Sequence, residues 1–194
     1  MDELTKYYKE SLLNNLCAEY KGYWQSASHD KKRLVDLVLA QQSLPHFLTY
    51  CHNGMGLSEG YVKRTFGEYI NGKYTAIDVD GVQGGYKSEI FVGFNHILSL
   101  SDDISCFMWC DVPQLEIKPT KAIKIYAGCS SNINIVCGGY NNVVVMLFDD
   151  STITLDDIDE DSTIIVYKYS DECRVTQGKY CLGTVKEFRK TLRL

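Results

Sequence analysis

One small pattern recurs through the second half of this chain: an apolar residue, any residue, and then a second apolar residue. The first members of successive pairs lie 8 to 11 residues apart. Short strands at near-constant spacing are typical of repeat architectures. The pairs are Ile104/Cys106, Leu115/Ile117, Ile123/Ile125, Ile133/Ile135, Val143/Val145, Ile153/Leu155, Ile164/Val166 and Cys173/Val175. The pattern therefore predicts a ladder of short β-strands.

A second period, twice as long, decides how these strands are arranged. Blocks 121–130, 141–150 and 162–171 align with one another, and so do the intervening blocks 131–140, 151–160 and 172–181. The first set has the longer apolar strand, with Tyr126, Phe148 and Tyr169 near its end. Alternation of two strand types favours a coil with two sides, in which like residues stack. We predict a parallel β-helix of three to four coils over residues 104–183, with a β-sandwich or meander as the alternative.

Small polar residues precede several of the apolar pairs, where a solenoid would turn. Such residues tolerate tight bends and hydrogen-bond to nearby backbone groups. They are Ser131-Asn132, Asn141-Asn142, Ser151-Thr152 and Ser162-Thr163. Both ends of a solenoid also need a cover, because each coil buries its apolar side only against a neighbour. We expect residues 184–194 to form a capping helix that buries Val185, Phe188 and Leu192.

The first 72 residues are helical in pattern, which makes the predicted fold class α+β. Apolar residues recur every four positions from about Asp2 to Lys21, so we expect a helix that ends at Gly22. Ser28 or Asp30 can cap a second helix, and a short third piece covers 46–54. Ser58 can cap a fourth helix that ends at Asn71-Gly72. Residues 73–103 are predicted to be an irregular crossover with one or two strands.

Charge and composition exclude some function classes. The 194 residues carry a net charge of −5, which argues against nucleic acid as the main partner. No apolar run is long enough to span a membrane, and the mixed-charge start MDELTKYYKESLL is unlike a secretory signal. We therefore expect the chain to be made and kept in a cytosol.

Eight cysteines could indicate disulfides or a metal site, but their spacing favours neither. There is no C-x-x-C motif, and Cys106-x-x-x-Cys110 has no matching second pair. Cys106 and Cys173 occupy apolar positions of the ladder, where a free thiol packs as a small hydrophobe. We predict reduced, buried thiols and no bound metal or cofactor.

Opposite charges near the C-terminus are the candidate assembly surfaces. Seven acidic residues lie between Asp149 and Asp161, and they suit a cation site or a pair of glycosidase carboxylates. We favour solvated turns that oppose end-to-end aggregation. The tail places basic residues at helical spacing, and these could meet the acidic turns of a neighbouring subunit. The proposed surfaces are Asp156, Asp157, Asp159, Glu160 and Asp161 on one side, and Lys186, Arg189, Lys190 and Arg193 on the other.

Residues typical of catalysis are not arranged for it. The four histidines are not at ligand spacing, and neither a serine-nucleophile motif nor a phosphate-binding loop occurs. Trp24 and Trp109 are expected to be core or interface anchors, and Trp109 lies in the apolar run CFMWC, which is expected to be buried. We therefore expect a non-enzymatic protein.

The start DELTKYYKESLLNNLCAEYKGYW and the end YKYSDECRVTQGKYCLGTVKEFRKTLRL resemble uncharacterised small proteins encoded by phages of gut bacteria. A helical head, a crossover and a short β-helix also look like capsid- or tail-associated phage proteins. The resemblance implies a virion component, such as a fibre, spike or attachment module, commonly trimeric and made in the host cytoplasm.

The leading functional hypothesis is a structural or attachment protein that self-associates and docks to a larger assembly through its helices. One alternative is a carbohydrate-binding module or small polysaccharide-active enzyme that uses the solenoid face to bind a glycan. Another is a phage-encoded inhibitor of a host protein.

Overall fold

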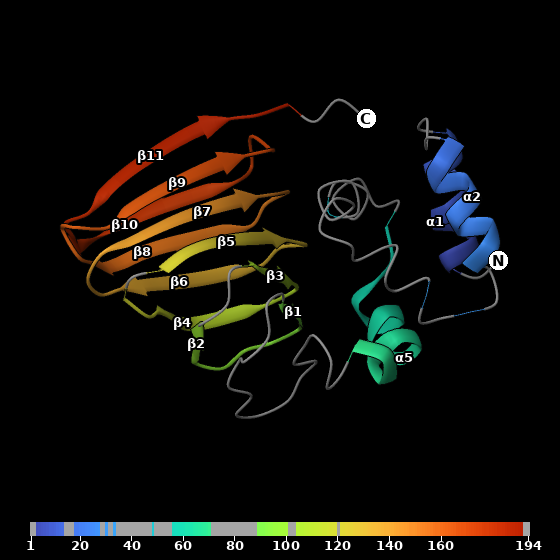
Figure 1. Ribbon diagram of the computed structural model, residues 1–194, viewed down its shortest axis with the longest axis horizontal. Coiled ribbons are helices and arrows are strands. Elements are labelled where there is room, and N and C mark those ends of the chain that lie inside the picture. Colours follow the sequence, from blue (N-terminus) through green and yellow to red (C-terminus); the bar gives the residue numbers. More distant parts are fainter. Residues whose placement is uncertain are drawn as a thin grey trace.

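The computed structural model describes residues 3–13, 18–27, 30, 33, 48, 56–70, 89–100, 104–119 and 121–191. In these residues three helices precede a long series of strands (Figure 1). The helices are α1 (Glu3–Leu13), α2 (Ala18–Ala27) and α5 (Glu59–Ile70).

The strands form two sheets in which every hydrogen-bonded pair is parallel. The first sheet has the order β1-β3-β5-β7-β9-β11 and the second the order β10-β8-β6-β4-β2. The strands of the first sheet are β1 (Glu89–Val92), β3 (Ile104–Met108), β5 (Lys121–Gly128), β7 (Asn141–Leu147), β9 (Thr163–Lys168) and β11 (Thr184–Arg189). Those of the second are β2 (Leu98–Leu100), β4 (Asp111–Ile117), β6 (Asn132–Cys137), β8 (Thr152–Ile158) and β10 (Arg174–Cys181).

Because successive strands alternate between the two sheets, the chain winds as a two-sided β-solenoid of about five coils. The predicted parallel β-helix is therefore confirmed, and the β-sandwich or meander alternative is wrong. The predicted three to four coils were too few. β1 and β2 agree with the one or two strands predicted within residues 73–103, but they belong to the solenoid and not to a crossover. These two strands pair in parallel with β3 and β4 and so form the first coil.

Like residues stack along the solenoid axis as the longer period predicts. Ile123 of β5 pairs with Val143 of β7, which pairs with Ile164 of β9. In the second sheet, Ile133 pairs with Ile153, which pairs with Val175. Ile133 and Ile153 are 0% exposed, and burying one such side chain contributes about 1.5–3 kcal/mol. The core is thus a stack of aliphatic rows between the two sheets.

The predicted alignment of block 172–181 with block 151–160 differs by one residue from the observed strand register. Arg174 pairs with Thr152, so Cys173 stacks at the corner beside Ser151 instead of occupying a strand position. The first pair is also misassigned, because Ile104 and Cys106 pair with Lys124 and Tyr126 on the outward side of the first sheet. Cys106 is buried there under the helices and not inside the solenoid.

The predicted C-terminal capping helix is wrong. Thr184–Arg189 is strand β11, which pairs in parallel with β9. A short isolated helix gains little, whereas a strand here adds a row of hydrogen bonds to a sheet that is already formed. In a strand, Lys186 and Lys190 share one side and Arg189 lies on the other, so the predicted single basic stripe is divided. Leu192 and Arg193 lie outside the described residues.

The helix caps are confirmed, but one helix boundary is wrong. The Arg33 N–H donates to Asp30 Oδ1 at 3.1 Å, and the Tyr61 N–H donates to Ser58 Oγ at 3.3 Å. Gly22 does not end a helix, because α2 continues through it to Ala27. Most of the predicted second helix and of the segment 46–54 lies outside the described residues, although Leu48 is buried. None of the described helices is long and apolar enough to cross a membrane.

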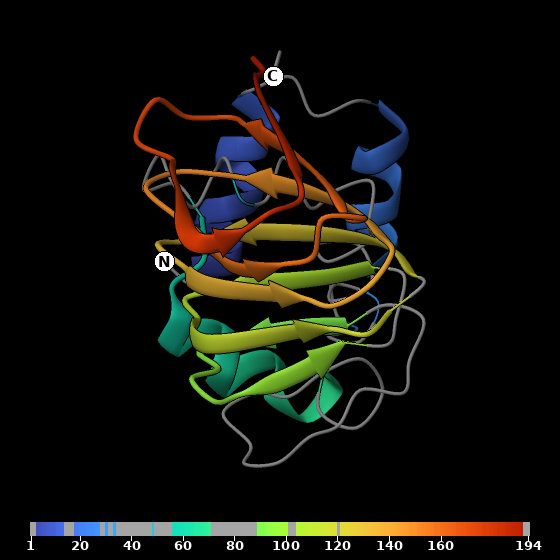
Figure 2. The same ribbon diagram turned by 90° about the vertical axis from the view of Figure 1, so that its left-hand side faces the viewer.

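The helices lie on one side of the solenoid, behind the strands in the view of Figure 2. They form a second apolar cluster with outward-facing residues of the first sheet, separate from the core inside the coils. Its buried members are Tyr7, Trp24, Ala27, Leu48, Leu57, Val62, Phe66, Ile90, Val92, Cys106, Met108, Tyr126, Cys129 and Phe148. The helical region is therefore packed onto the solenoid.

Candidate functional site

The turns that lead from the first sheet to the second form a stacked edge, here called the first corner. The first four of these turns contain left-handed residues, whereas the turn from β9 to β10 contains none. The left-handed residues are Gly93 (φ 64°), Trp109 (φ 54°), Cys129 (φ 55°), Ser130 (φ 60°) and Asp149 (φ 50°). A positive φ is costly for a bulky residue such as Trp109. Trp109 is also only partly buried, whereas its neighbours Met108 and Cys110 are fully buried, so the prediction that the whole CFMWC run is buried is wrong.

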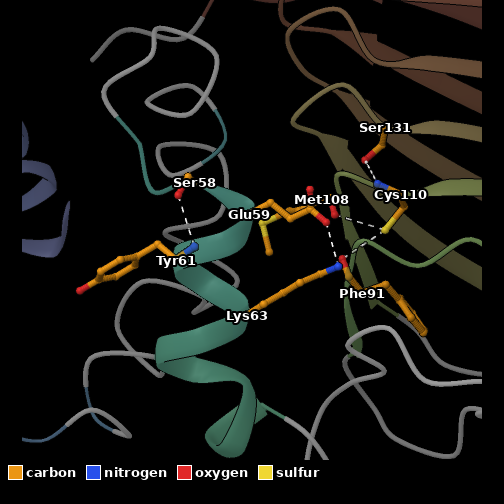
Figure 3. A network of polar contacts seen from close by, with 8 residues as sticks. All are labelled: Ser58, Glu59, Tyr61, Lys63, Phe91, Met108, Cys110 and Ser131. Atoms are coloured by element: carbon orange, nitrogen blue, oxygen red, sulfur yellow. Dashed lines mark hydrogen bonds and ion pairs between the residues drawn. The ribbon is translucent and has the colours of Figure 1, made fainter.

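Buried serines connect successive coils at this corner. The Ser131 hydroxyl accepts a hydrogen bond from the Cys110 N–H at 3.1 Å, shown in Figure 3, and donates to the Gly128 carbonyl at 2.6 Å. One coil later, the Ser151 hydroxyl accepts from the Ser131 N–H at 3.0 Å. The predicted role of these small polar residues as corners is confirmed.

Asp149 has a structural role within this ladder. Its side chain is 5% exposed and accepts hydrogen bonds from the backbone N–H groups of Cys129, Ser130 and Ser151 and from the Ser151 hydroxyl. Burial raises the pKa of this carboxyl above its usual range, and the hydrogen bonds oppose that rise. Its oxygens accept hydrogen bonds from two successive coils, which assigns the side chain a structural role at the corner.

The turns from the second sheet back to the first form a second corner, which contains most of the predicted acidic surface. Asp159 Oδ2 accepts from the Gly139 N–H at 3.1 Å, and the Ser162 hydroxyl donates to the Gly139 carbonyl. Asp156, Asp157, Glu160 and Asp161 are exposed. In this acidic set, one residue is therefore hydrogen-bonded to the backbone of the corner, and the other four side chains are exposed to solvent.

A groove of about 600 Å³ lies between the first corner and the helices, and we call it the acidic groove. Its lining contains five carboxylates and one lysine, together with the indole of Trp109 and the side chain of Leu57. The lining residues are Glu3, Lys6, Gly56, Leu57, Ser58, Glu59, Trp109, Cys129, Ser130, Asp149, Asp150 and Glu172.

Two carboxylates on the helical side of this groove form contacts within the helical region. Glu3 of α1 accepts hydrogen bonds from the Ser58 N–H at 2.8 Å and from its hydroxyl, which ties α1 to the start of α5. Glu59 forms an ion pair with Lys63 at 2.8 Å along α5 (Figure 3). A side chain at Gly93 would collide with this pair, since its Cβ would lie 2.4 Å from Lys63 Nζ. The ends of these two side chains can move aside, so the positive φ of 64° is what favours glycine where the first coil passes under α5.

Two carboxylates of the solenoid side extend the groove along the corner. Asp150 and Glu172 also line an adjoining hollow of about 630 Å³, together with Thr152, Asp171 and Arg174. Asp150, Asp171 and Glu172 are all exposed. The two hollows share Asp150 and Glu172, so these two carboxylates lie where the hollows meet.

The last strand presents a surface of opposite charge, here called the basic edge and made of Lys186, Phe188 and Lys190. Lys186 and Phe188 alternate along β11 and share its outward side. Lys190 follows the end of the strand, and its N–H still donates to the Lys168 carbonyl of β9, so it continues this alternation. Phe188 is 46% exposed and stacks on Tyr167 with ring centroids 5.6 Å apart. Lys190 Nζ lies 5.1 Å from the centroid of the Tyr167 ring.

The ion pairs of β11 do not involve the predicted acidic set. Lys168 pairs with Glu187 at 2.9 Å and Arg189 pairs with Asp171 at 2.8 Å. The groove carboxylates Glu3, Glu59 and Glu172 were not among the predicted site residues. Nothing in the sequence signals that α1, α5 and the first corner meet, because they lie far apart along the chain.

Thiols and metal ligands give no reactive centre in the part of the chain described. Burial raises the pKa of the Cys110 thiol to about 12, and Cys106, Cys129, Cys137 and Cys173 are also buried and form no disulfide bond. Among the described residues, no group of three or more potential ligands is placed to hold a metal ion. Cys17 and Cys51 lie outside those residues.

Comparison with known proteins does not assign the chain to a family. No protein-family model matches the chain, and neither curated proteins nor solved structures yield a match.

Proposed function

We propose that this chain is a non-enzymatic structural or attachment protein that self-associates through the C-terminal end of its solenoid and joins a larger assembly. One observation carries the proposal: three of the six exposed large apolar side chains of the described residues belong to the last coil. They are Tyr180 of β10 (59% exposed), Leu182 of the turn (68%) and Phe188 of β11 (46%). Aromatic side chains are enriched at protein contact surfaces, so their concentration at this end favours a contact there.

The position of β11 supports contact at this end. It is the last strand in the order of the first sheet, so its outer edge has no neighbouring strand among the described residues. Its charged residues oppose simple strand addition, because charges on an edge strand disfavour uncontrolled pairing. A contact through side chains of the last coil is compatible with both features.

The chemistry of the buried groups supports a role other than catalysis. Asp149, the carboxyl with a raised pKa, is occupied by four hydrogen-bond donors of the corner. The thiol of Cys110 has a raised pKa, so it is a poor nucleophile near neutral pH. Burial in the packed corner explains the raised pKa values of both groups.

The setting we propose follows the resemblance of the chain ends to phage proteins: a virion component such as a fibre, spike or attachment part. Mass spectrometry of purified particles tests it, and absence of the chain from particles whose other components are detected would contradict it. The glycan-binding and host-inhibitor hypotheses stay predictions, which a glycan array and a host-lysate pull-down would test.

Self-association is tested by size-exclusion chromatography with light scattering at about 1 to about 100 µM, the range of moderate protein affinities. We expect a mass above that of the monomer, rising with concentration. Phe188→Ser should shift the population toward monomer. Tyr140→Ser is the matched control, since Tyr140 is 60% exposed but lies at the second corner. A strictly monomeric wild type, or equal effects of the two variants, would overturn the proposal.

A further inference from the structure

We propose that the acidic groove of one copy binds the basic edge of a second copy of this chain. This inference rests on the proposed self-association and names the two surfaces that meet. It joins Asp150 and Glu172, which line the groove, to Lys186 and Lys190 of the partner copy.

Charge complementarity is the first argument. The groove has five carboxylates and one lysine. The adjoining hollow adds Arg174 and Asp171, and Asp171 is already paired with Arg189 of its own chain. Glu3, Glu59 and Asp149 are committed to Ser58, Lys63 and the corner backbone. Asp150 and Glu172 are exposed and shared by both hollows, so they are placed to meet an incoming cation. Opposite charges across an interface favour the correct partner and register.

The spacing and chemistry of the basic edge fit a groove of this composition. Alternate residues of a strand lie about 6.6–7 Å apart on one side, so Lys186 and Lys190 are separated by about 13 Å. The exposed ring of Phe188 lies between them. The groove offers carboxylates together with the partly exposed indole of Trp109 and with Leu57, so it can accept both charges and an aromatic ring.

The basic edge cannot enter the groove of its own chain. Thr184 to Arg189 are paired residue by residue with Thr163 to Lys168 of β9, which holds Lys186 and Phe188 at the side of the solenoid. The groove lies at the first corner, beyond the ends of the first-sheet strands and under α1 and α5. Within its own chain β11 reaches only the adjoining hollow, where Arg189 pairs with Asp171, so Lys186 and Phe188 are left for another molecule.

The two surfaces differ, so each copy offers one of each. Contacts of this kind close as a reciprocal pair or as a ring, which includes the trimer that the phage resemblance implies, or continue as a filament. In every case each copy donates a basic edge and accepts one in its groove. This property allows a charge-exchange test that does not depend on the number of subunits.

The test uses two variants of the full chain. The edge variant carries Lys186→Glu and Lys190→Glu, and the groove variant carries Asp150→Lys and Glu172→Lys. We expect each variant alone to show at least a tenfold rise in the dissociation constant, measured by sedimentation velocity. An equimolar mixture should recover affinity to within about threefold of the wild type, because each edge then meets a groove of opposite charge.

Asp111→Lys with Glu116→Lys is the matched control, since it changes two exposed carboxylates of β4 that lie outside the groove lining and away from the last coil. It should associate as the wild type does. Circular dichroism melts verify that each variant is folded. For the unmodified protein, raising the salt from about 50 mM to about 500 mM should weaken association, because exposed charges are screened.

The outcomes separate this inference from the proposed function. Association of the wild type that is insensitive to salt, or two dissociated variants that do not recover on mixing, would overturn the groove-and-edge contact. Self-association that depends on Phe188 would then still stand. A wild type that is monomeric throughout would overturn both.

Discussion

Lys168 Nζ and Glu187 Oε2 form an ion pair of 2.9 Å at the C-terminal end of the solenoid core. Lys168 pairs in register with the buried Leu147, and Glu187 pairs with the buried Val166. Two of the apolar rows that run through the coils therefore end in opposite charges, whereas the row of Ile164 ends in Val185. Inward-pointing charges on an edge strand oppose pairing with another molecule. This ion pair, in place of a capping helix, closes the core at this end.

Replacing this ion pair with apolar residues should allow molecules to associate at the last coil of the solenoid. We expect Lys168→Leu with Glu187→Val to form large particles of many subunits, detected by light scattering, because the last coil would then present an apolar row to another molecule. Glu116→Val with Lys118→Leu is the control, since both residues are exposed and the change in net charge is the same. A double variant with the particle size of the wild type would contradict the role assigned to the pair.

Ser131 should contribute strongly to stability despite its small side chain. Ser131→Ala removes the acceptor for the Cys110 N–H and the donor to the Gly128 carbonyl, both within the buried corner. Leaving such groups unsatisfied costs about 1–3 kcal/mol. Ser26→Ala, at an exposed position of α2, should change stability by less than about 0.5 kcal/mol. Urea unfolding of the two variants measures this difference, and equal effects would count against the serine ladder.

Asp149 should make stability fall as the pH rises from acid to neutral. Its pKa in the folded protein is raised by burial, so the folded state holds the proton more tightly than the unfolded chain does. The resulting stabilisation is complete below the ordinary pKa of about 4 and is lost as the pH passes the raised value. Relative to Asp149→Asn, which tolerates the left-handed backbone, the wild type should lose unfolding free energy over this window. A relative gain with rising pH, in denaturant titrations at several pH values, would refute this assignment.

Cysteine reactivity should follow burial. Cys181 is the one cysteine of the described residues that is not buried, whereas Cys110 is buried and has a pKa raised to about 12. Because the thiolate is the reactive form, native protein treated with iodoacetamide near pH 8 should be labelled at Cys181 well before Cys110. Peptide mass spectrometry gives the order. Early labelling of Cys110 would show that the first corner opens in solution.

The repeat in the sequence was sufficient to predict the solenoid, because a parallel stack places residues of like position in contact. Ile133, Ile153 and Val175 occupy one row, and the polar residues before each strand form the corners. Those features depend on local order along the chain. The same period carries no information on where the repeat stops, which is why β1, β2 and β11 were assigned to a crossover and a helix.

The candidate site was harder to predict, because it depends on contacts between distant segments. Glu3, Glu59 and Glu172 meet at the groove only after the helices pack on the first sheet. Lys186, Arg189 and Lys190 were identified as basic, but helical spacing placed them on one face, and the strand separates Arg189 from the other two. Tertiary context decided the conformation of this short segment.

The parallel order of neighbouring coils is the claim on which the corners, the closed end and the two assembly surfaces all depend. It is tested most directly by methyl nuclear Overhauser contacts in selectively labelled protein. The account predicts contacts from Ile133 to Ile153 and from Ile135 to Leu155, which follow the same order along β6 and β8. Dominant contacts in the reverse order, from Ile133 to Leu155 and from Ile135 to Ile153, would contradict it.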